Sequence, residues 1–500
     1  MIGKSSARVR AYIVACGSLF LLGACATGGG IKPMSAPPEL GHLEVGQSIE
    51  DLAQPNPERT GMIEWWKAYG DPQLDHLIGI ALDRAPSMTA AFAAIRRAEA
   101  QFAGIAAEDK PLVTGDGEII GERFPDHYIY LPPYAGNVGS EGALIVDARY
   151  RLDFWGKRRA AIFSAGERLK AARAEASDAA LLLRTAVVEA YVQLDAAYKI
   201  HDIAVSGLSR RQGVIDLLAF RTKAGLATDI DSVQAKEAIT ETRSEIARLK
   251  GEIERRRHQI AALLGKDPGF AEEIGRPALA TIPDPAPLST IPATLLGYRP
   301  DVAMQRALVE AAAHDIGVAR AAFYPDVDLT AFAGLKSLDL GFLLRPESAA
   351  LGIAPAITLP IFDGGRLRSN LKGRAADYDA AVSAYNATIS TALRQVADGV
   401  VTLRSEWAGK AEADAAVTHW RRVVDLQKIR ERHSLSCAMD RLATETALLL
   451  SERRAAESDA RVAIAKVTLI RALGGTWAPS SFLPAGHAAL GTDPDAAQDR

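Results

Sequence analysis

Four segments of the chain alternate between apolar and other residues with the period of a β-strand. They cover residues 112–122, 142–154, 326–336 and 352–362. In the second segment, Leu144, Val146 and Ala148 fall on one face, whereas Asp147 and Arg149 fall on the other. Successive side chains of a strand point to opposite sides of its sheet. The pattern therefore predicts four strands with one apolar face each.

Two much longer segments lack this period and contain no proline. From Lys157 to about Ala219 the chain consists mainly of Ala, Glu, Arg, Leu and Lys, which favour the helix, and residues 366–432 repeat this composition. A helix of about 60 residues would be about 90 Å long. Such a length favours a coiled coil or a helical array. A bundle of several shorter helices is the alternative interpretation.

The two halves of the chain carry the same landmarks in the same order. Pro86 and Pro111 recur 214 residues later as Pro300 and Pro325. Residues 152–159 match 359–366, residues 225–226 match 434–435, and residues 264–265 match 473–474. A pattern repeated over most of a chain indicates one supersecondary unit used twice. Each copy is expected to contain a helix, two strands and two long helices.

Cys25 follows the features of an export signal. Lys4, Arg8 and Arg10 precede an apolar run, residues 11–23, which ends in small residues. Residues 22–25, Leu-Gly-Ala-Cys, resemble a lipobox, in which the cysteine is acylated and becomes the new N-terminus. Ala26 in place of aspartate points by the same resemblance to the outer membrane. An ordinary signal with an incidental cysteine is the alternative.

Composition excludes several classes of function. A formal net charge of −3 over 500 residues offers no electrostatic case for binding nucleic acid. After residue 25 no apolar run approaches the roughly 20 residues of a membrane helix. The nine histidines form no metal-ligand motif, and no phosphate-binding glycine loop is present. We therefore expect neither an enzyme nor a cofactor.

The four strands suit a transmembrane barrel whose polar side lines water. The polar residues assigned to this lumen are Asp147, Arg149, Arg151, Asp153, Asp326 and Asp328. Four strands cannot close a barrel, and open edges in lipid are costly, so the barrel must be shared between chains. A dimer would form an eight-stranded barrel, whose interior is filled by its own side chains. A trimer would form a twelve-stranded barrel, which leaves a passage. A half-buried antiparallel sheet on a soluble core is the competing interpretation.

Several segments together resemble the TolC-like outer membrane factors, specifically the NodT-type efflux lipoproteins. They are residues 65–74, 262–269, 298–302, 316–325 and 359–367. The resemblance implies a mainly α-helical homotrimer in which a twelve-stranded β-barrel continues into a long periplasmic α-helical barrel. It also implies docking to a periplasmic adaptor, a membrane fusion protein, and to an inner membrane pump, often of the RND type.

The resemblance further implies which residues meet the adaptor at two helical hairpin tips. They are Gly225, Leu226 and Thr228 at the first tip, and Ser434, Leu435 and Ser436 at the second. The second tip departs from the family pattern because it has no glycine. Asp216 and Asp425, just before the tips, are candidates for a closed periplasmic aperture. A solvated carboxylate on an outer helix face is the alternative for each.

The sequence thus predicts an outer membrane efflux channel with a passive path for drugs or metabolites. Its expected parts are a signal peptide (1–24), a lipid-anchored linker (25–59), a first repeat (60–267), an inter-repeat linker (268–292), a second repeat (293–475) and a disordered tail (476–500). Two other functions remain open at this stage. One is the channel of a type I protein secretion system, and the other is a periplasmic scaffold lipoprotein without a pore.

Overall fold

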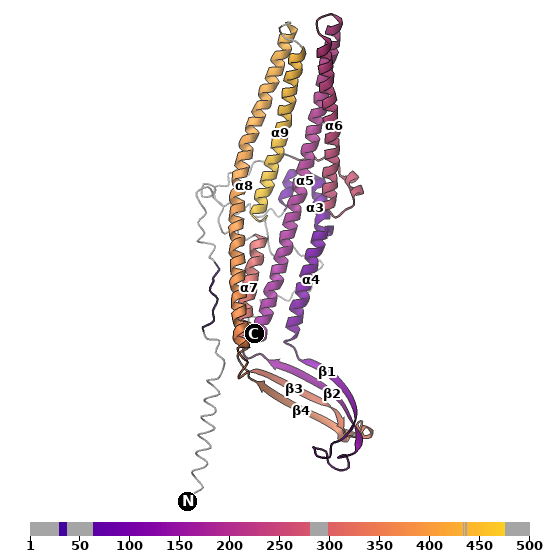
Figure 1. Cartoon of the computed structure of the whole chain (residues 1–500), viewed down its shortest axis with the longest axis vertical. Helices are drawn as coiled ribbons and strands as arrows, with labels where there is room; N and C mark the ends of the chain where they lie inside the picture. Colours follow the sequence, from indigo (N-terminus) through magenta and orange to yellow (C-terminus); the bar gives the residue numbers. More distant parts are fainter. Residues whose placement is uncertain (1–29, 38–63, 281–298, 434, 436–437, 476–500) are drawn as a thin grey trace.

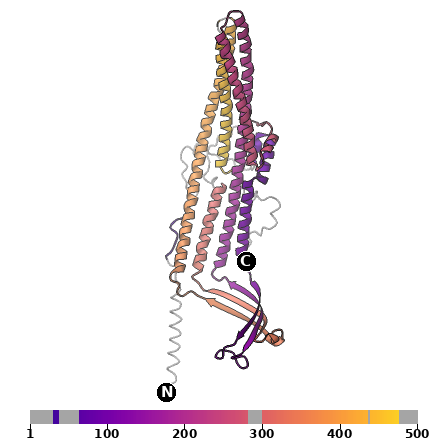
Figure 2. The same cartoon turned by 45° about the vertical axis from the view of Figure 1, so that its right-hand side comes forward.

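The computed structural model describes residues 30–37, 64–280, 299–433, 435 and 438–475. The described chain is elongated, with long helices standing on one end of a small curved sheet (Figure 1). A view turned by 45° shows the sheet bending away below the helices (Figure 2). Helix and sheet therefore form two separate zones along the long axis.

The elements form two matching series. The first contains α4 (Pro86–Ala107), β1 (Leu112–Arg123), β2 (Val138–Leu152), α5 (Lys157–Lys223) and α6 (Asp229–Leu263). The second contains α7 (Pro300–Ala321), β3 (Asp326–Ser337), β4 (Ala349–Thr358), α8 (Arg366–Arg432) and α9 (Ala438–Ala472). α4 and α7 have 22 residues each, α5 and α8 have 67, and α6 and α9 have 35. The duplication read from the sequence is therefore a duplication of structure.

Short elements fill the connections. They are η3 (Trp65–Tyr69), α3 (Pro72–Arg84), η4 (Pro268–Glu273), η6 (Leu340–Phe342) and η7 (Pro346–Ser348). α4 and α6 pack along α5, and α7 and α9 pack along α8 (Figure 1). α5 also packs against α7 and α9, which joins the two repeats. Both long helices start directly after a glycine with positive φ, Gly156 at +70° and Gly365 at +90°. Glycine tolerates this left-handed turn, which ends the strand connection and lets the helix begin.

The four strands form one antiparallel sheet in the order β1-β2-β3-β4. The central β2–β3 pairing joins the two repeats, and it runs from Gly142 opposite Ser337 to Leu152 opposite Val327. The limits of two strands predicted from the sequence are wrong. β2 covers Val138–Leu152 instead of 142–154, and β4 covers Ala349–Thr358 instead of 352–362. Pro360 lies two residues past the end of β4, and a proline has no N–H for the ladder.

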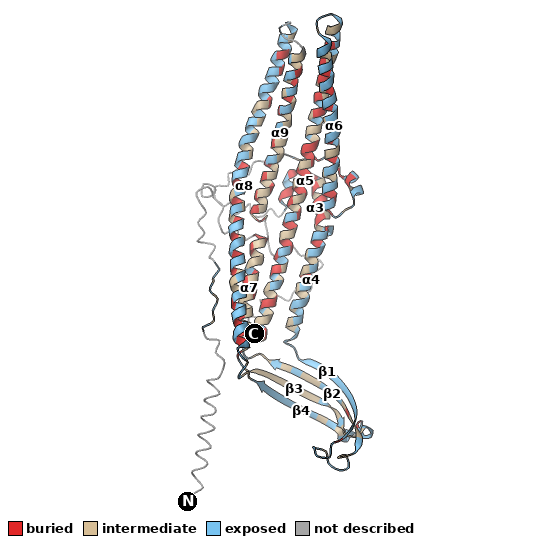
Figure 3. Ribbon diagram, viewed as in Figure 1, coloured by how far each residue is buried: buried red, intermediate tan, exposed pale blue. Residues whose placement is uncertain are grey.

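The core lies between the helices, where buried residues follow their facing sides (Figure 3). In the first repeat, Trp65 and Trp66 pack with Tyr191 of α5 in one large cluster. The Tyr191 hydroxyl donates to Asp71 Oδ2 at 2.7 Å and accepts from Gln73 Nε2 at 2.6 Å. Burial and the Asp71 carboxylate raise the pKa of Tyr191. These contacts fix α3 and η3 to the middle of α5.

Candidate functional site

The pairing register brings the polar residues of neighbouring strands onto one face of the sheet. Arg149 lies opposite Thr330, and Arg151 lies opposite Asp328. Arg151 Nε donates to Asp328 Oδ1 at 2.9 Å. Asp147 belongs to the same face because it is two residues before Arg149. The polar alternation of β2 and β3 therefore forms one continuous stripe.

Two of the residues assigned to the lumen lie at the base of the sheet. Asp153 follows the end of β2, and its carboxylate accepts from the N–H of Arg159 at 2.9 Å in the first turn of α5. Asp326 is the first residue of β3 and pairs with Lys157 Nζ at 3.1 Å. These two carboxylates thus lie where the sheet meets the helices.

The opposite face of the sheet is apolar and uncovered in the single chain. Its exposed side chains are Val113, Ile119, Leu144, Val146, Leu351, Ile353 and Ile357. Leu351 and Ile353 are 81% and 74% exposed. A contiguous exposed apolar patch marks a surface that contacts a membrane or a protein. This face is therefore expected to contact lipid or protein instead of water.

The sheet also has two open edges. Within the described residues no strand pairs with the outer edge of β1 or of β4. Each edge presents unpaired N–H and C=O groups, which are costly wherever water is absent. An apolar face combined with two open edges leaves the sheet of the single chain without its complement of neighbours.

The first hairpin tip connects α5 to α6 in a compact turn. Gly225 adopts a φ of +74°, and the N–H of Leu226 donates to the Arg221 carbonyl at 2.8 Å. Thr228 caps α6 reciprocally with Asp231, whose carboxylate accepts from the N–H of Thr228 at 2.9 Å. This bond lowers the pKa of Asp231. The apolar side chains of Phe220, Leu226, Ile230 and Val233 are exposed around the turn.

The second hairpin tip keeps part of this geometry without the glycine. The N–H of Leu435 donates to the Arg430 carbonyl at 2.9 Å, which is the bond that Leu226 makes at the equivalent position. Arg430 Nη2 also donates to the Leu435 carbonyl at 3.3 Å. Ser434 and Ser436 lie outside the described residues, as does Cys25. Arg430 and Arg432 in the last turn of α8 correspond to Arg221 and Lys223 in the last turn of α5, so both tips are basic. Leu435 is exposed at this tip as Leu226 is at the first.

Asp216 and Asp425 occupy equivalent positions, each seven residues before the end of its long helix. Both are exposed. Asp216 accepts from Gln212 Nε2 at 3.1 Å, and Asp425 pairs with Lys428 at 3.5 Å. Within the described part of a single chain, each carboxylate contacts a neighbour on its own helix and not the other carboxylate.

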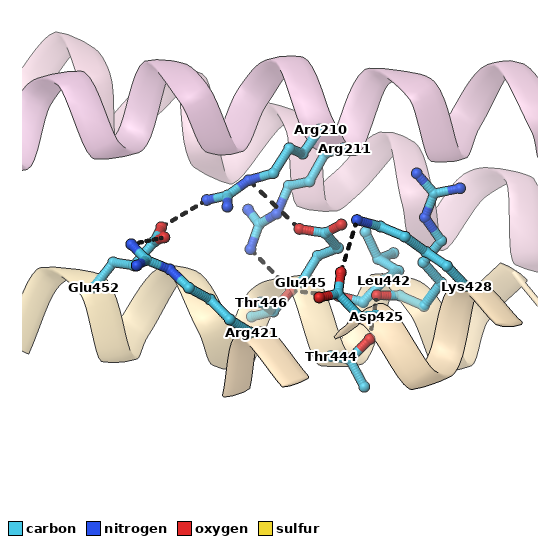
Figure 4. A network of polar contacts seen from close by, with 11 residues as sticks. Arg210, Arg211, Arg421, Asp425, Lys428, Leu442, Thr444, Glu445, Thr446 and Glu452 are labelled. Atoms are coloured by element: carbon cyan, nitrogen blue, oxygen red, sulfur yellow. Dashed lines mark hydrogen bonds and ion pairs between the residues drawn. The ribbon is translucent and has the colours of Figure 1, made fainter. Parts of the chain in front are cut away.

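A polar network between the two hairpins was not foreseen from the sequence (Figure 4). Arg210 of α5 contacts Glu452 at 2.9 Å and Glu445 at 3.4 Å, both on α9. The neighbouring Arg211 donates to Thr446 Oγ1 at 2.9 Å, and burial lowers its pKa. The only sequence signal is the position of Arg211 on the buried face of α5, three residues before Val214.

Among the described residues, no group of three or more His, Cys, Asp or Glu side chains is placed to hold a metal ion. None of the helices described here is both long enough and apolar enough to cross a membrane.

Known proteins share this architecture. The chain is 36% identical over 358 residues to the fusaric acid resistance protein FusA of Burkholderia cepacia, covering 71% of this chain and 67% of that protein. It is 30% identical over 430 residues to the multidrug resistance outer membrane protein MdtP of Escherichia coli strain K12, covering 83% and 86%. The crystal structure of the outer membrane protein VceC of Vibrio cholerae superposes with a TM-score of 0.75 at 32% identity, covering 82% of this chain and 98% of that one.

Fold and relatives define an efflux channel of the outer membrane, in which β-strands continue into a large periplasmic helical portion. The family model described as outer membrane efflux protein matches residues 77–266 and 291–475, and the chain belongs to this family. The resemblance drawn from the sequence is confirmed, together with the fold class, the location and the efflux function that it implied.

Proposed function

We propose that three copies of the mature chain, each anchored through an acylated Cys25, assemble into one outer membrane duct. The observation that carries this proposal is the open four-stranded sheet with its uncovered apolar face. Three such sheets supply twelve strands, which is enough to close a barrel around a passage. In this arrangement the apolar face contacts lipid, and the stripe of Asp147, Arg149, Arg151 and Asp328 faces the water-filled lumen.

The helices continue the duct into the periplasm. Helices of 67 residues such as α5 and α8 are about 100 Å long, so three chains make a tall helical wall. The family membership supports passive conduction, with the driving energy supplied by other proteins and no catalytic step in the chain.

The partners follow from the class of protein. We propose an adaptor that binds the hairpin tips, Gly225, Leu226, Thr228, Ser434, Leu435 and Ser436, and an inner membrane pump of the RND type behind it. Asp216 and Asp425 are proposed to line the periplasmic aperture. FusA and MdtP are named for resistance to fusaric acid and to several drugs. These names support small toxic organic compounds as cargo and speak against secreted proteins.

Native mass spectrometry of the detergent-extracted protein tests assembly and anchoring together. We expect a trimer in which each chain carries the mass of the acyl groups on Cys25. The same sample should form pores in planar bilayers, and a chain that forms none would be a scaffold. Deletion of the gene should sensitise the bacterium to organic toxins. Unchanged susceptibility together with a lost secreted protein would instead indicate type I export.

A further inference from the structure

Residues 30–37, near the N-terminus, lie in an extended conformation against α8 (Figure 1). The N–H groups of Met34 and Ser35 both donate to the carboxylate of Asp379, at 2.9 and 2.8 Å. Met34 N also lies 3.2 Å from the second carboxylate oxygen. Hydrogen bonds to an ionised acceptor are about twice as strong as neutral ones. The two amide bonds lower the pKa of Asp379, so the carboxylate is charged at neutral pH.

A second contact holds the same segment closer to the sheet. Ile31 packs on the apolar cluster of Ile316, Phe323, Leu367 and Leu371, which lies at the first turns of α8. Along the segment, Ile31, Pro33 and Ser35 are half-buried, whereas Lys32 and Met34 are exposed. This alternation is expected of an extended strand that rests on a surface.

The spacing of the two contacts agrees with a segment laid along the helix. Leu371 and Asp379 are eight residues apart, which is about 12 Å of helix. Ile31 and Ser35 are four residues apart, which is about 13 Å of extended chain. The segment therefore runs in the same direction as α8, and its N-terminal end points toward the sheet.

We propose that Asp379 and the apolar cluster around Leu371 form a docking site for residues 30–37, which fixes the height of the Cys25 lipid anchor beside the sheet. This inference rests on the acylation of Cys25 proposed above. Cys25 is six residues before Ile31, and six residues span at most about 22 Å. Without docking, Cys25 would be tethered only at Glu64, 39 residues further along the chain, which spans at most about 140 Å. The docking site thus restricts the lipid anchor to a short distance from Ile31. We call residues 30–37 the docked segment.

The N-terminal end of the docked segment lies near the junction of the sheet and the helices, and the side chains at this junction suit a membrane interface. Trp155 stacks on Tyr324 with ring centroids 4.7 Å apart, and both rings are about half exposed where the strands give way to the helices. Trp155 Nε1 donates to the Pro325 carbonyl at 2.9 Å. Tryptophan and tyrosine gather at the interface of a membrane with water. Acyl chains fixed near Ile31 would enter the bilayer at this interface.

Hydrogen exchange of the full-length protein in detergent tests the docking site. We compare the peptide that covers residues 30–37 in the parent, in Asp379→Ala and in Asp377→Ala. Asp377 is a matched control, because it lies on the same helix and pairs with Arg374 at 3.3 Å. In Asp379→Ala the amides of Met34 and Ser35 should exchange about tenfold faster, and in Asp377→Ala they should not change.

Ser35→Pro removes the backbone N–H that donates to Asp379 and leaves the sequence of α8 unchanged. It therefore tests the same hydrogen bond if Asp379→Ala fails to assemble. Equal protection of this peptide in the parent, Asp379→Ala and Ser35→Pro would overturn the docking site. The intact mass of each chain reports acylation separately. A chain without acyl groups that still shows the Asp379-dependent protection would refute the anchor and retain the docking, so the two failures are distinguishable.

Discussion

Arg299 shows how one side chain joins three helices of the second repeat. Its buried guanidinium donates to the Ala472 carbonyl at 2.7 Å, to Gln395 at 2.9 Å and to Asp301 at 2.7 and 3.0 Å. Arg299→Ala leaves these acceptors without their donor, and we expect it to lower the free energy of unfolding by about 3 kcal/mol. Denaturant unfolding in detergent measures this loss.

The control for this substitution is Arg394→Ala on α8. Arg394 pairs with Asp398 at 2.8 Å, but both side chains are more than 60% exposed. Exposed pairs of this kind contribute well under about 1 kcal/mol. If both substitutions destabilise equally, burial of Arg299 is not the cause.

The N-terminal cap of α6, which Thr228 and Asp231 form together, stabilises the helix in a way that depends on the charge of Asp231. The ionised carboxylate of Asp231 accepts from the N–H of Thr228 more strongly than the protonated form would, so this bond lowers the pKa of Asp231 below the ordinary 3.8. The stabilisation is therefore complete at neutral pH and is lost as the pH falls through this lowered value. Amide exchange at the start of α6 should rise in that acidic window. Asp231→Asn should show the faster exchange at every pH, and an identical pH profile would contradict the assignment.

At the scale of elements, local sequence patterns predicted the helices and strands but not the contacts between distant residues. The limits of α8, 366–432, follow from composition alone, and α5 extends only four residues past its predicted end. These features are local, because helix propensity and alternation act over neighbouring residues. The bond from Arg210 to Glu452 joins residues 242 positions apart, and the Asp379 site joins positions 345 apart. No local pattern specifies which distant side chains meet.

The two hairpin tips share a backbone bond and a mixture of exposed apolar and basic side chains. The first exposes Leu226 and Lys223, and the second exposes Leu435 and Arg432. We expect Leu226→Ser to weaken adaptor binding equally at low and high salt. Arg432→Glu should weaken binding mainly at low salt, because surface electrostatics is screened by ions. Surface plasmon resonance with the adaptor measures both, and Arg394→Glu, far from the tips, is the control. Equal salt dependence for both variants would show that the apolar and the basic side chains of the tips do not act separately in this way.

At the scale of the whole molecule, the network of Arg210 couples the two hairpins of one chain. Arg210→Ala would leave Glu445, which is 4% exposed, without its cation. A buried unpaired carboxylate is costly, so the hairpins should move apart to admit water. We expect a several-fold higher conductance of the resting channel in planar bilayers. Arg255→Ala, which breaks only a pair within α6, should leave conductance unchanged. No difference between the two variants would exclude the network as a restraint on the aperture.

The sheet offers a direct comparison between its two faces at neighbouring residues of β4. Ile353 lies opposite Ala331 on the apolar face, and Ala354 lies opposite Thr330 on the polar face. An arginine at a lipid-facing position near the bilayer midplane costs about 2–4 kcal/mol, and three subunits would each bear that cost. Ile353→Arg should therefore reduce the amount of trimer recovered from the outer membrane.

Ala354→Arg should assemble normally, because its guanidinium would project into water. It would add one positive charge per subunit to the lumen, so the pore should become more selective for anions in bilayer recordings. If Ile353→Arg assembled as well as the parent while Ala354→Arg did not, the faces would be assigned the wrong way round. Equal loss in both variants would mean that the sheet is enclosed by protein on both sides, because only a face in water accepts the charge.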